Sequence, residues 1–303
     1  MSHTMTRART GADARRAPAP RRRPARPRGH RTRPRSIAYH AVMLTVSAVA
    51  VFPVLWVLYM SFGDADSWSH PAQILAHPVT ANYGDVLAQP NGFLTWLTNS
   101  FIVALATTLI GVLISASAGY ALSRMRFPGH RPLMWAFLVT QMFPVAILIV
   151  PLYNILSALH LLYTYGGLVL TYCTISLPFC AWMLKGYFDT VPPEIDEAGR
   201  IDGLNPFGTF WRLIMPLAKP GIAVTAFYTF LTAWGEVAYA TQFMTTPDKY
   251  TLAVGLQTYV GQFKAEWGAM TAASVMITAL AAVVFFLVQR HLVSGLTAGA
   301  SKS

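Results

Sequence analysis

Charged residues are scarce in this chain of 303 residues, because Asp, Glu, Lys and Arg make up only 12% of it. A soluble domain usually carries roughly 25%. Twelve of the 23 basic residues stand before Ser36, so the rest of the chain consists mainly of apolar blocks. This composition argues against an ordinary soluble protein and predicts an integral membrane protein.

Signatures of catalysis are also lacking. The sequence contains no G-x4-G-K-[ST] motif to hold nucleotide phosphates, no H-E-x-x-H and no serine elbow. Its two cysteines, Cys173 and Cys180, would lie roughly 10 Å apart on one helix, too far for a disulfide. We therefore expect buried thiols, no metal, no cofactor in this subunit and no enzymatic activity of its own.

Apolar blocks long enough to cross a bilayer occur six times after the Arg-rich start, since a span takes roughly 20 helical residues. The predicted fold is therefore an all-α integral membrane protein with six transmembrane helices. The spans are expected at about 37–62, 98–122, 133–156, 166–188, 220–244 and 268–290. Residues 1–36 are expected to be a disordered tail near anionic lipid, and 37–303 one transmembrane domain. No aromatic or folded module accompanies the tail, so nucleic acid is not an expected partner.

Two features of these spans carry structural expectations. Gly111, Ser115 and Gly119 recur every four residues in the second span and would let another helix approach closely. Pro144 and Pro151 are expected to kink the third span.

Basic residues fix the expected orientation. With the N-terminus inside, only Lys249 and Lys264 of the 23 basic residues fall outside the membrane. The positive-inside rule then places both termini and the polar loop 189–219 in the cytoplasm.

The loop 189–219 holds eight of the 22 charged residues that follow the tail. Pro192 and Pro193 end the fourth span, and the acids after them favour the start of a short helix. Gly203 is suited to a left-handed helix cap. A second helix is expected over 207–215. The apolar side of this second helix is expected to consist of Phe207, Phe210, Trp211 and Ile214. Such a helix–turn–helix is either a docking surface for a soluble partner or an ordinary connection.

The loop resembles a known motif. It is similar to the EAA loop of ABC-importer permeases, whose pattern is E-A-A-x3-G-x9-I-x-L-P. The matching residues are Glu197-Ala198-Gly199, Gly203 and Leu213-Ile214-Met215-Pro216, with Gly199 in place of the second alanine. Further segments resemble MalG-type permeases of maltose/maltodextrin importers over about 37–303. They are SRMRFPG (123–129), QMFP (141–144), KGYFDTVP (185–192), YTLAVGLQ (250–257) and QRHLVSGLTAGASK (289–302).

The resemblance implies a permease subunit in a prokaryotic inner membrane. Its implied partners are a second homologous permease, two ATPase subunits that bind ATP and Mg²⁺, an extracellular solute-binding protein, membrane lipid and a sugar. The EAA helix of the family seats in a cleft on the ATPase. That coupling role is carried here to Glu197, Ala198, Gly199, Asp202 and Gly203.

Two residues near the outer end of the fifth span, Trp234 and Glu236, are candidates for the translocation path. Interfacial anchoring of Trp234, and solvation or bonding of Glu236 to a neighbouring helix, are the alternatives. The resemblance thus implies that the chain forms half of the path of an ATP-driven sugar importer, for maltose, maltodextrin or a related oligosaccharide. An ABC permease for another small solute is the alternative. An ion-coupled transporter is less favoured, because it usually needs buried acids; a channel or scaffold is weaker still.

Overall fold

The structure, a computed structural model, describes residues 33–64, 68–261 and 266–300, with side chains for 36–64, 68–261 and 266–289. It divides into two compact units, Met1–Val51 and Phe52–Ser303. The described part of the first unit is the beginning of helix α1 (Arg33–Met60). The predicted disordered tail lies almost entirely outside the described residues. Helix α1 already begins at Arg33, four residues before the predicted span.

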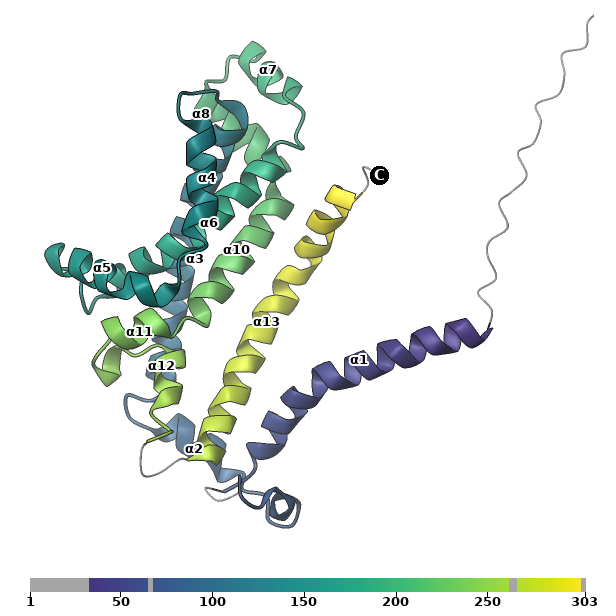
Figure 1. The fold of residues 1–303 in the computed structure, drawn as a ribbon, viewed down its shortest axis with the longest axis vertical. Coiled ribbons are helices and arrows are strands. Elements are labelled where there is room, and N and C mark those ends of the chain that lie inside the picture. The colour runs from purple at the N-terminus through teal and green to yellow at the C-terminus, as the bar shows by residue number, and fades with distance from the viewer. Residues whose placement is uncertain (1–32, 65–67, 262–265, 301–303) are drawn as a thin grey trace, which may run out of the picture. The chain divides into compact units, whose positions relative to one another are not determined.

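Four helices form the centre of the second unit. Helix α3 (Phe93–Arg124) lies along both α6 (Tyr165–Phe188) and α10 (Lys219–Trp234), and α13 (Trp267–Ala300) lies along α10 (Figure 1). Their shared apolar core contains Trp96, Tyr172 and Phe230. Helix α6 is more buried than α3, and α13 is much less buried than either, so its apolar surface is largely left free to face lipid or another protein chain.

Shorter helices complete the second unit, and every regular element among the described residues is helical, as predicted. These shorter elements are η1 (Pro71–Leu75), α2 (Ala81–Ala88), α4 (His130–Thr140), α5 (Val145–Ala158), α7 (Glu194–Ile201), α8 (Pro206–Thr209), the π-helical η2 (Phe210–Ile214), α9 (Met215–Leu217), α11 (Ala238–Phe243), η3 (Pro247–Lys249) and α12 (Leu252–Gln257).

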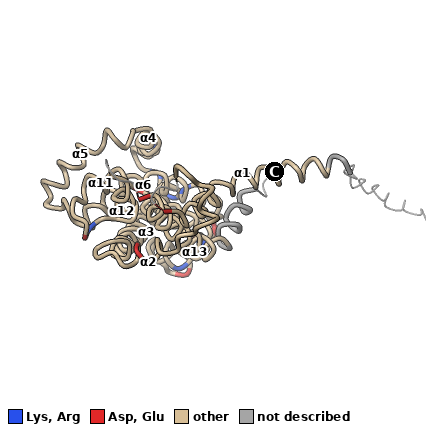
Figure 2. The backbone as a smooth tube through the Cα atoms, turned by 90° about the horizontal axis from the view of Figure 1, so that it is seen from below, with Lys and Arg blue, Asp and Glu red and all other residues tan. Residues whose placement is uncertain are grey.

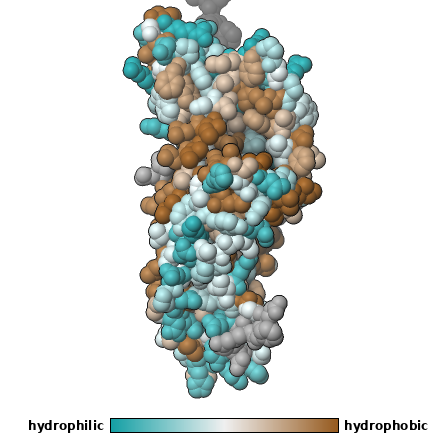
Figure 3. All heavy atoms as spheres, turned by 90° about the vertical axis from the view of Figure 1, so that its left-hand side faces the viewer, coloured by the Kyte–Doolittle hydropathy of each residue, from teal (hydrophilic) through white to brown (hydrophobic). Residues whose placement is uncertain are grey.

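Four described helices are long and apolar enough to cross a membrane, and up to six spans result if each of two bent helix pairs counts as one. Lys, Arg, Asp and Glu occupy only short stretches of the chain in Figure 2. Hydrophobic side chains gather in the upper and middle part of the face shown in Figure 3, whereas its lower part is mainly hydrophilic. The predicted class, an all-α multi-pass membrane protein, is confirmed.

The third predicted span, 133–156, is not one kinked helix. Helices α4 and α5 meet at 109° across a break of four residues, Gln141–Pro144. Pro144 has no amide hydrogen and disfavours helical geometry in the residue before it, so the chain turns there. The sequence predicted a kink at Pro151 as well. This proline lies inside helix α5.

The fifth predicted span, 220–244, is also interrupted. Helix α10 ends at Trp234 after 16 residues, which is about 24 Å of helix and short of the roughly 30 Å of a hydrocarbon core. Gly235, Glu236 and Val237 separate it from α11. The segment Pro206–Leu217 meets α10 at 83° at its other end, so this part of the chain is a series of short helices.

The small-residue face of α3 is confirmed. A Cβ atom on Gly119 would lie 3.0 Å from the carbonyl oxygen of Ala181 and 3.0 Å from the amide nitrogen of Lys185, both in α6. Ser115 is fully buried, and a Cβ on Gly111 would lie 3.3 Å from Thr229 of α10. The two cysteines are free and buried, again as predicted.

This close approach makes Gly119 a sensitive position. Gly119→Ala should destabilise the protein by about 1–3 kcal/mol, because the new methyl group meets backbone atoms that cannot move aside. Thermal unfolding in detergent measures the effect. Gly186→Ala is the matched control, since a Cβ at Gly186 of α6 meets no atom within 4 Å. Equal melting temperatures for the two variants would contradict the tight contact.

Candidate coupling loop

The loop that follows α6 has a small hydrophobic core of its own. Phe188 at the end of α6, Phe210 of η2 and Tyr120 of α3 contact one another through their rings, with Tyr120 and Phe210 centroids 4.9 Å apart. Val191 and Ile214 are buried in the same cluster. The loop is therefore packed onto the ends of the long helices and is not an irregular connection.

Helix α7 begins and ends as its sequence predicts. Pro193 precedes its first residue, and three acids in the first turn suit the positive end of the helix dipole. After Ile201, Gly203 adopts a left-handed φ of 79°, and the amide of Leu204 donates to the carbonyl of Gly199 at 2.9 Å. The side chain of Asn205 then accepts from the amide of Gly208 at 2.7 Å and starts α8.

One acid of α7 points inward. Asp196 is only 7% exposed. Its Oδ1 accepts from the hydroxyl of Tyr120 at 2.5 Å, and its Oδ2 accepts from Nε of Arg124 at 2.8 Å. Nη2 of the same arginine donates to the carbonyl of Val191 at 2.7 Å. We call Asp196, Tyr120 and Arg124 the anchor cluster.

The anchor cluster contains an ion pair, Arg124–Asp196, that has little access to water. The side chain of Arg124 is 16% exposed and that of Asp196 is 10% exposed. The net stability from such a pair is small, but removing one partner alone typically costs about 3–5 kcal/mol because it leaves a buried charge uncompensated. The cluster was not singled out in the sequence. An arginine at the end of the second predicted span and an acid in the loop after the fourth gave no sign that they meet.

The five predicted coupling residues do not share one face. Glu197, Ala198, Asp202 and Gly203 are exposed, whereas Gly199 is buried. A Cβ on Gly199 would lie 2.9 Å from Oγ1 of Thr209 and 3.0 Å from Cδ1 of Leu213. Gly199 thus packs inside the loop and does not lie on its outer surface.

The predicted apolar side of the second helix is divided in the same way. Phe210 and Ile214 are buried, while Phe207 is 70% exposed and Trp211 is also exposed. Ile201 is 87% exposed, whereas Ile195 of the same helix packs on the loop core. The outer surface of the loop therefore combines exposed acids with exposed apolar side chains, which is a composition suited to a protein partner.

The two candidate path residues have structural contacts. Trp234 is buried, with its ring 4.9 Å from Phe101 and 5.4 Å from Phe230, centroid to centroid. Glu236 is half-buried, and its two carboxylate oxygens accept from the amides of Tyr239 at 2.9 Å and Ala240 at 3.1 Å. Glu236 therefore starts α11, and Trp234 packs in the core.

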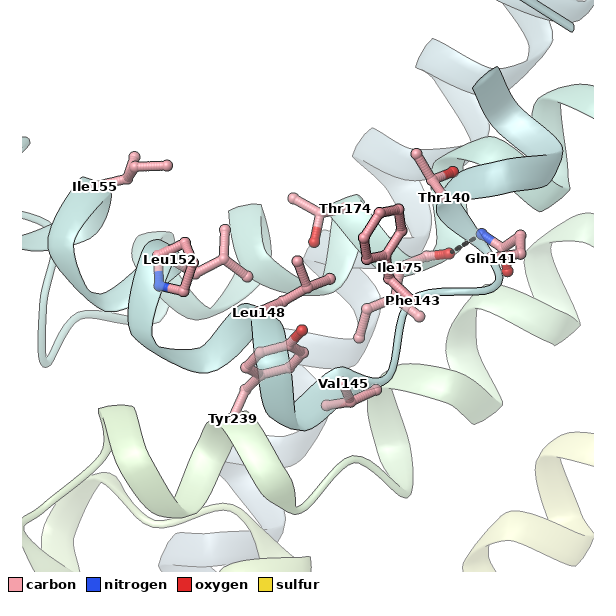
Figure 4. Close-up of a pocket in the computed structure, with 11 residues that line it drawn as sticks. Thr140, Gln141, Phe143, Val145, Leu148, Leu152, Ile155, Thr174, Ile175 and Tyr239 are labelled. Carbon is pink, nitrogen blue, oxygen red and sulfur yellow. Dashed lines mark hydrogen bonds between the residues drawn. The ribbon is translucent and has the colours of Figure 1, made fainter. Parts of the chain in front are cut away.

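A pocket of about 420 Å³ lies where α4 breaks into α5, against α6 and α11. Figure 4 shows Thr174, Phe143 and Tyr239 on different sides of it, and Gln141 donating from Nε2 to the carbonyl of Ile175 at 3.1 Å. Most of the other lining residues are aliphatic. The sequence gave no sign of this pocket, because it depends on the bend between α4 and α5.

The fold and the loop together define a helical multi-pass membrane protein with a packed, partly acidic loop between two of its spans. A family model, described as the binding-protein-dependent transport system inner membrane component, matches residues 111–297. The chain belongs to this family, whose members are permease components of ABC transport systems in prokaryotic inner membranes. The matched residues include the whole candidate coupling loop.

Relatives in this family extend the match over nearly the whole chain. The sulfoquinovosyl glycerol transport system permease protein of Agrobacterium fabrum is 35% identical, covering 83% of this chain and 89% of that protein. The maltose/maltodextrin transport system permease protein of Vibrio vulnificus is 34% identical, covering 88% and 95%. The crystal structure of a bacterial ABC transporter involved in the import of the acidic polysaccharide alginate shares the fold, with a TM-score of 0.70, 22% identity, and 84% and 95% coverage.

The methyl group of an alanine at position 199 would lie against the side chain of Thr209. Gly199→Ala should lower the melting temperature despite the better helix propensity of alanine, which is worth roughly 1 kcal/mol, because the methyl group displaces Thr209. Gly199→Ala/Thr209→Ala should recover the loss, since Thr209 has no hydrogen-bond partner for its buried hydroxyl among the described residues. Thr209→Ala alone is the control. A melting temperature unchanged by Gly199→Ala would contradict the contact.

Proposed function

We propose that the chain is the transmembrane permease subunit of an ATP-driven sugar importer, and that it forms half of the translocation path. The observation that supports this proposal is the family match, together with relatives of more than 30% identity that are permease proteins of maltose/maltodextrin or sulfoquinovosyl glycerol transport systems. Maltose, maltodextrin or a related oligosaccharide is the favoured substrate class. An ABC permease for another small solute is the alternative.

The candidate coupling loop is the proposed attachment point for the ATPase. Its exposed acids, Glu197 and Asp202, can accept charged hydrogen bonds from basic groups on a partner. Ala198 beside them adds little bulk, and the exposed Ile201 and Phe207 add apolar area. We propose contact roles for Glu197, Ala198, Asp202 and Gly203, and an internal packing role for Gly199.

The rest of the assembly follows from this role. Two ATPase subunits would bind ATP and Mg²⁺, a second permease would complete the path, and a solute-binding protein would deliver the sugar from outside. Both termini and the coupling loop would face the cytoplasm. This chain would perform no covalent chemistry: it would alternate between inward-facing and outward-facing states as the ATPases close and open.

An uptake assay tests the proposed function. The full-length chain, expressed with the permease, ATPase and binding-protein genes of its own genomic neighbourhood, should restore uptake of radiolabelled maltose or maltotriose to a host lacking its own importers. Uptake should require ATP and the binding protein. Uptake that persists without the ATPase, or that is driven by a proton or sodium gradient, would overturn the proposal in favour of an ion-coupled carrier.

Charge reversal on the loop tests its attachment role. Glu197→Lys should reduce copurification of the ATPase and uptake by at least roughly tenfold, because a lysine repels the basic groups that a carboxylate would bind. Asp85→Lys, at an exposed position of α2, is the matched control and should leave both unchanged. Normal copurification and uptake with Glu197→Lys would count against the loop as the attachment point.

A further inference from the structure

The anchor cluster ties α7 to a helix that is not its neighbour in the chain. Asp196 belongs to the same helix as the exposed Glu197, whereas Tyr120 and Arg124 belong to α3, more than 70 residues earlier. Among the described residues, Arg124–Asp196 is the ion pair that joins α7 to another element, since the second ion pair, Lys185–Asp189, lies at the end of α6.

The geometry gives both oxygens of Asp196 a donor on α3. Arg124 also binds the carbonyl of Val191, so one guanidinium holds α7 and the segment that leads into it. A planar guanidinium with several fixed donors resists rotation better than a single-point contact would. The cluster therefore restricts both the position and the tilt of α7 relative to α3.

Without this cluster, α7 would be joined to the bundle by its chain connections and by apolar packing alone. Residues 189–193 and 202–205 connect it along the chain, and Ile195 and Gly199 add apolar packing with the loop core. Helix α7 has only eight residues, too few to be stable alone. A force applied at its outer face could then tilt it without moving α3.

We propose that Asp196, Tyr120 and Arg124 are positioning residues that make α7 and α3 move as one body, so that movement of the ATPase reaches the transmembrane bundle through α3. The inference rests on the proposed function. Helix α3 packs along both α6 and α10, so its displacement carries the centre of the bundle with it. Asp196 acts through α3 and needs no contact with the ATPase.

The experiment uses the full-length chain purified with its own partners and reconstituted in liposomes. Spin labels at Glu194→Cys in α7 and Ser117→Cys in α3, both exposed positions, report the distance between the two helices; Cys173 and Cys180 are buried and should not be labelled. In the unmodified cluster this distance should stay constant when ATP is added. With Arg124→Gln it should change or broaden.

Transport coupling is the second measurement. Arg124→Gln and Asp196→Asn, each alone, should raise the ATP hydrolysed per solute transported by roughly tenfold, because each leaves a buried partner unpaired. The double variant Asp196→Asn/Arg124→Gln should recover part of the loss, since two amides can bond to each other. Lys185→Gln, which breaks the more exposed ion pair at the end of α6, is the matched control and should have no effect.

The outcomes separate the possibilities. A constant label distance and a normal ATP-to-solute ratio with Arg124→Gln would overturn the inference while leaving the proposed function standing. If that variant does not assemble, Tyr120→Phe decides, because it removes one hydroxyl and keeps the ring contacts with Phe188 and Phe210. A wild-type complex that transports without ATP would overturn the proposed function and the inference together.

Discussion

The backbone contact between α3 and α6 is the constraint on which the rest of the structure depends. It exists because Gly119 has no side chain, so that α3 meets the backbone of Ala181 and Lys185 directly. In a bilayer, where lipid is as apolar as leucine, close packing of small residues supplies much of what holds helices together. The same contact brings the end of α3 beside the end of α6, and thereby places Tyr120 and Arg124 within reach of the loop.

Much of this architecture could be predicted from the sequence. Long apolar blocks gave the helical membrane class, and the spacing of Gly111, Ser115 and Gly119 gave the close helix contact. The proline pair and Gly203 gave the limits of α7. These predictions succeeded because they rest on local rules: the length needed to cross a bilayer, the geometry of a helix cap and the size of a side chain.

The features that the sequence did not predict depend on contacts between distant residues. The apolar content of 133–156 and 220–244 fitted single spans, but a proline break in one and the capping carboxylate of Glu236 in the other divide them. Gly199 matched a motif position, yet which way it faces depends on Thr209. Asp196 stood beside two exposed acids with the same charge, and only the folded path of α3 shows that it pairs with Arg124.

The broken helices have a consequence for the surroundings of the protein. Where α4 and α10 end inside segments of spanning length, terminal carbonyl and amide groups are left without helical partners. Hydrocarbon chains cannot satisfy such groups, so irregular backbone at this depth is stable only beside protein or a water-filled cavity. Any backbone group without a partner at the bends Gln141–Pro144 and Gly235–Val237 would, at that depth, need protein or water beside it rather than lipid acyl chains.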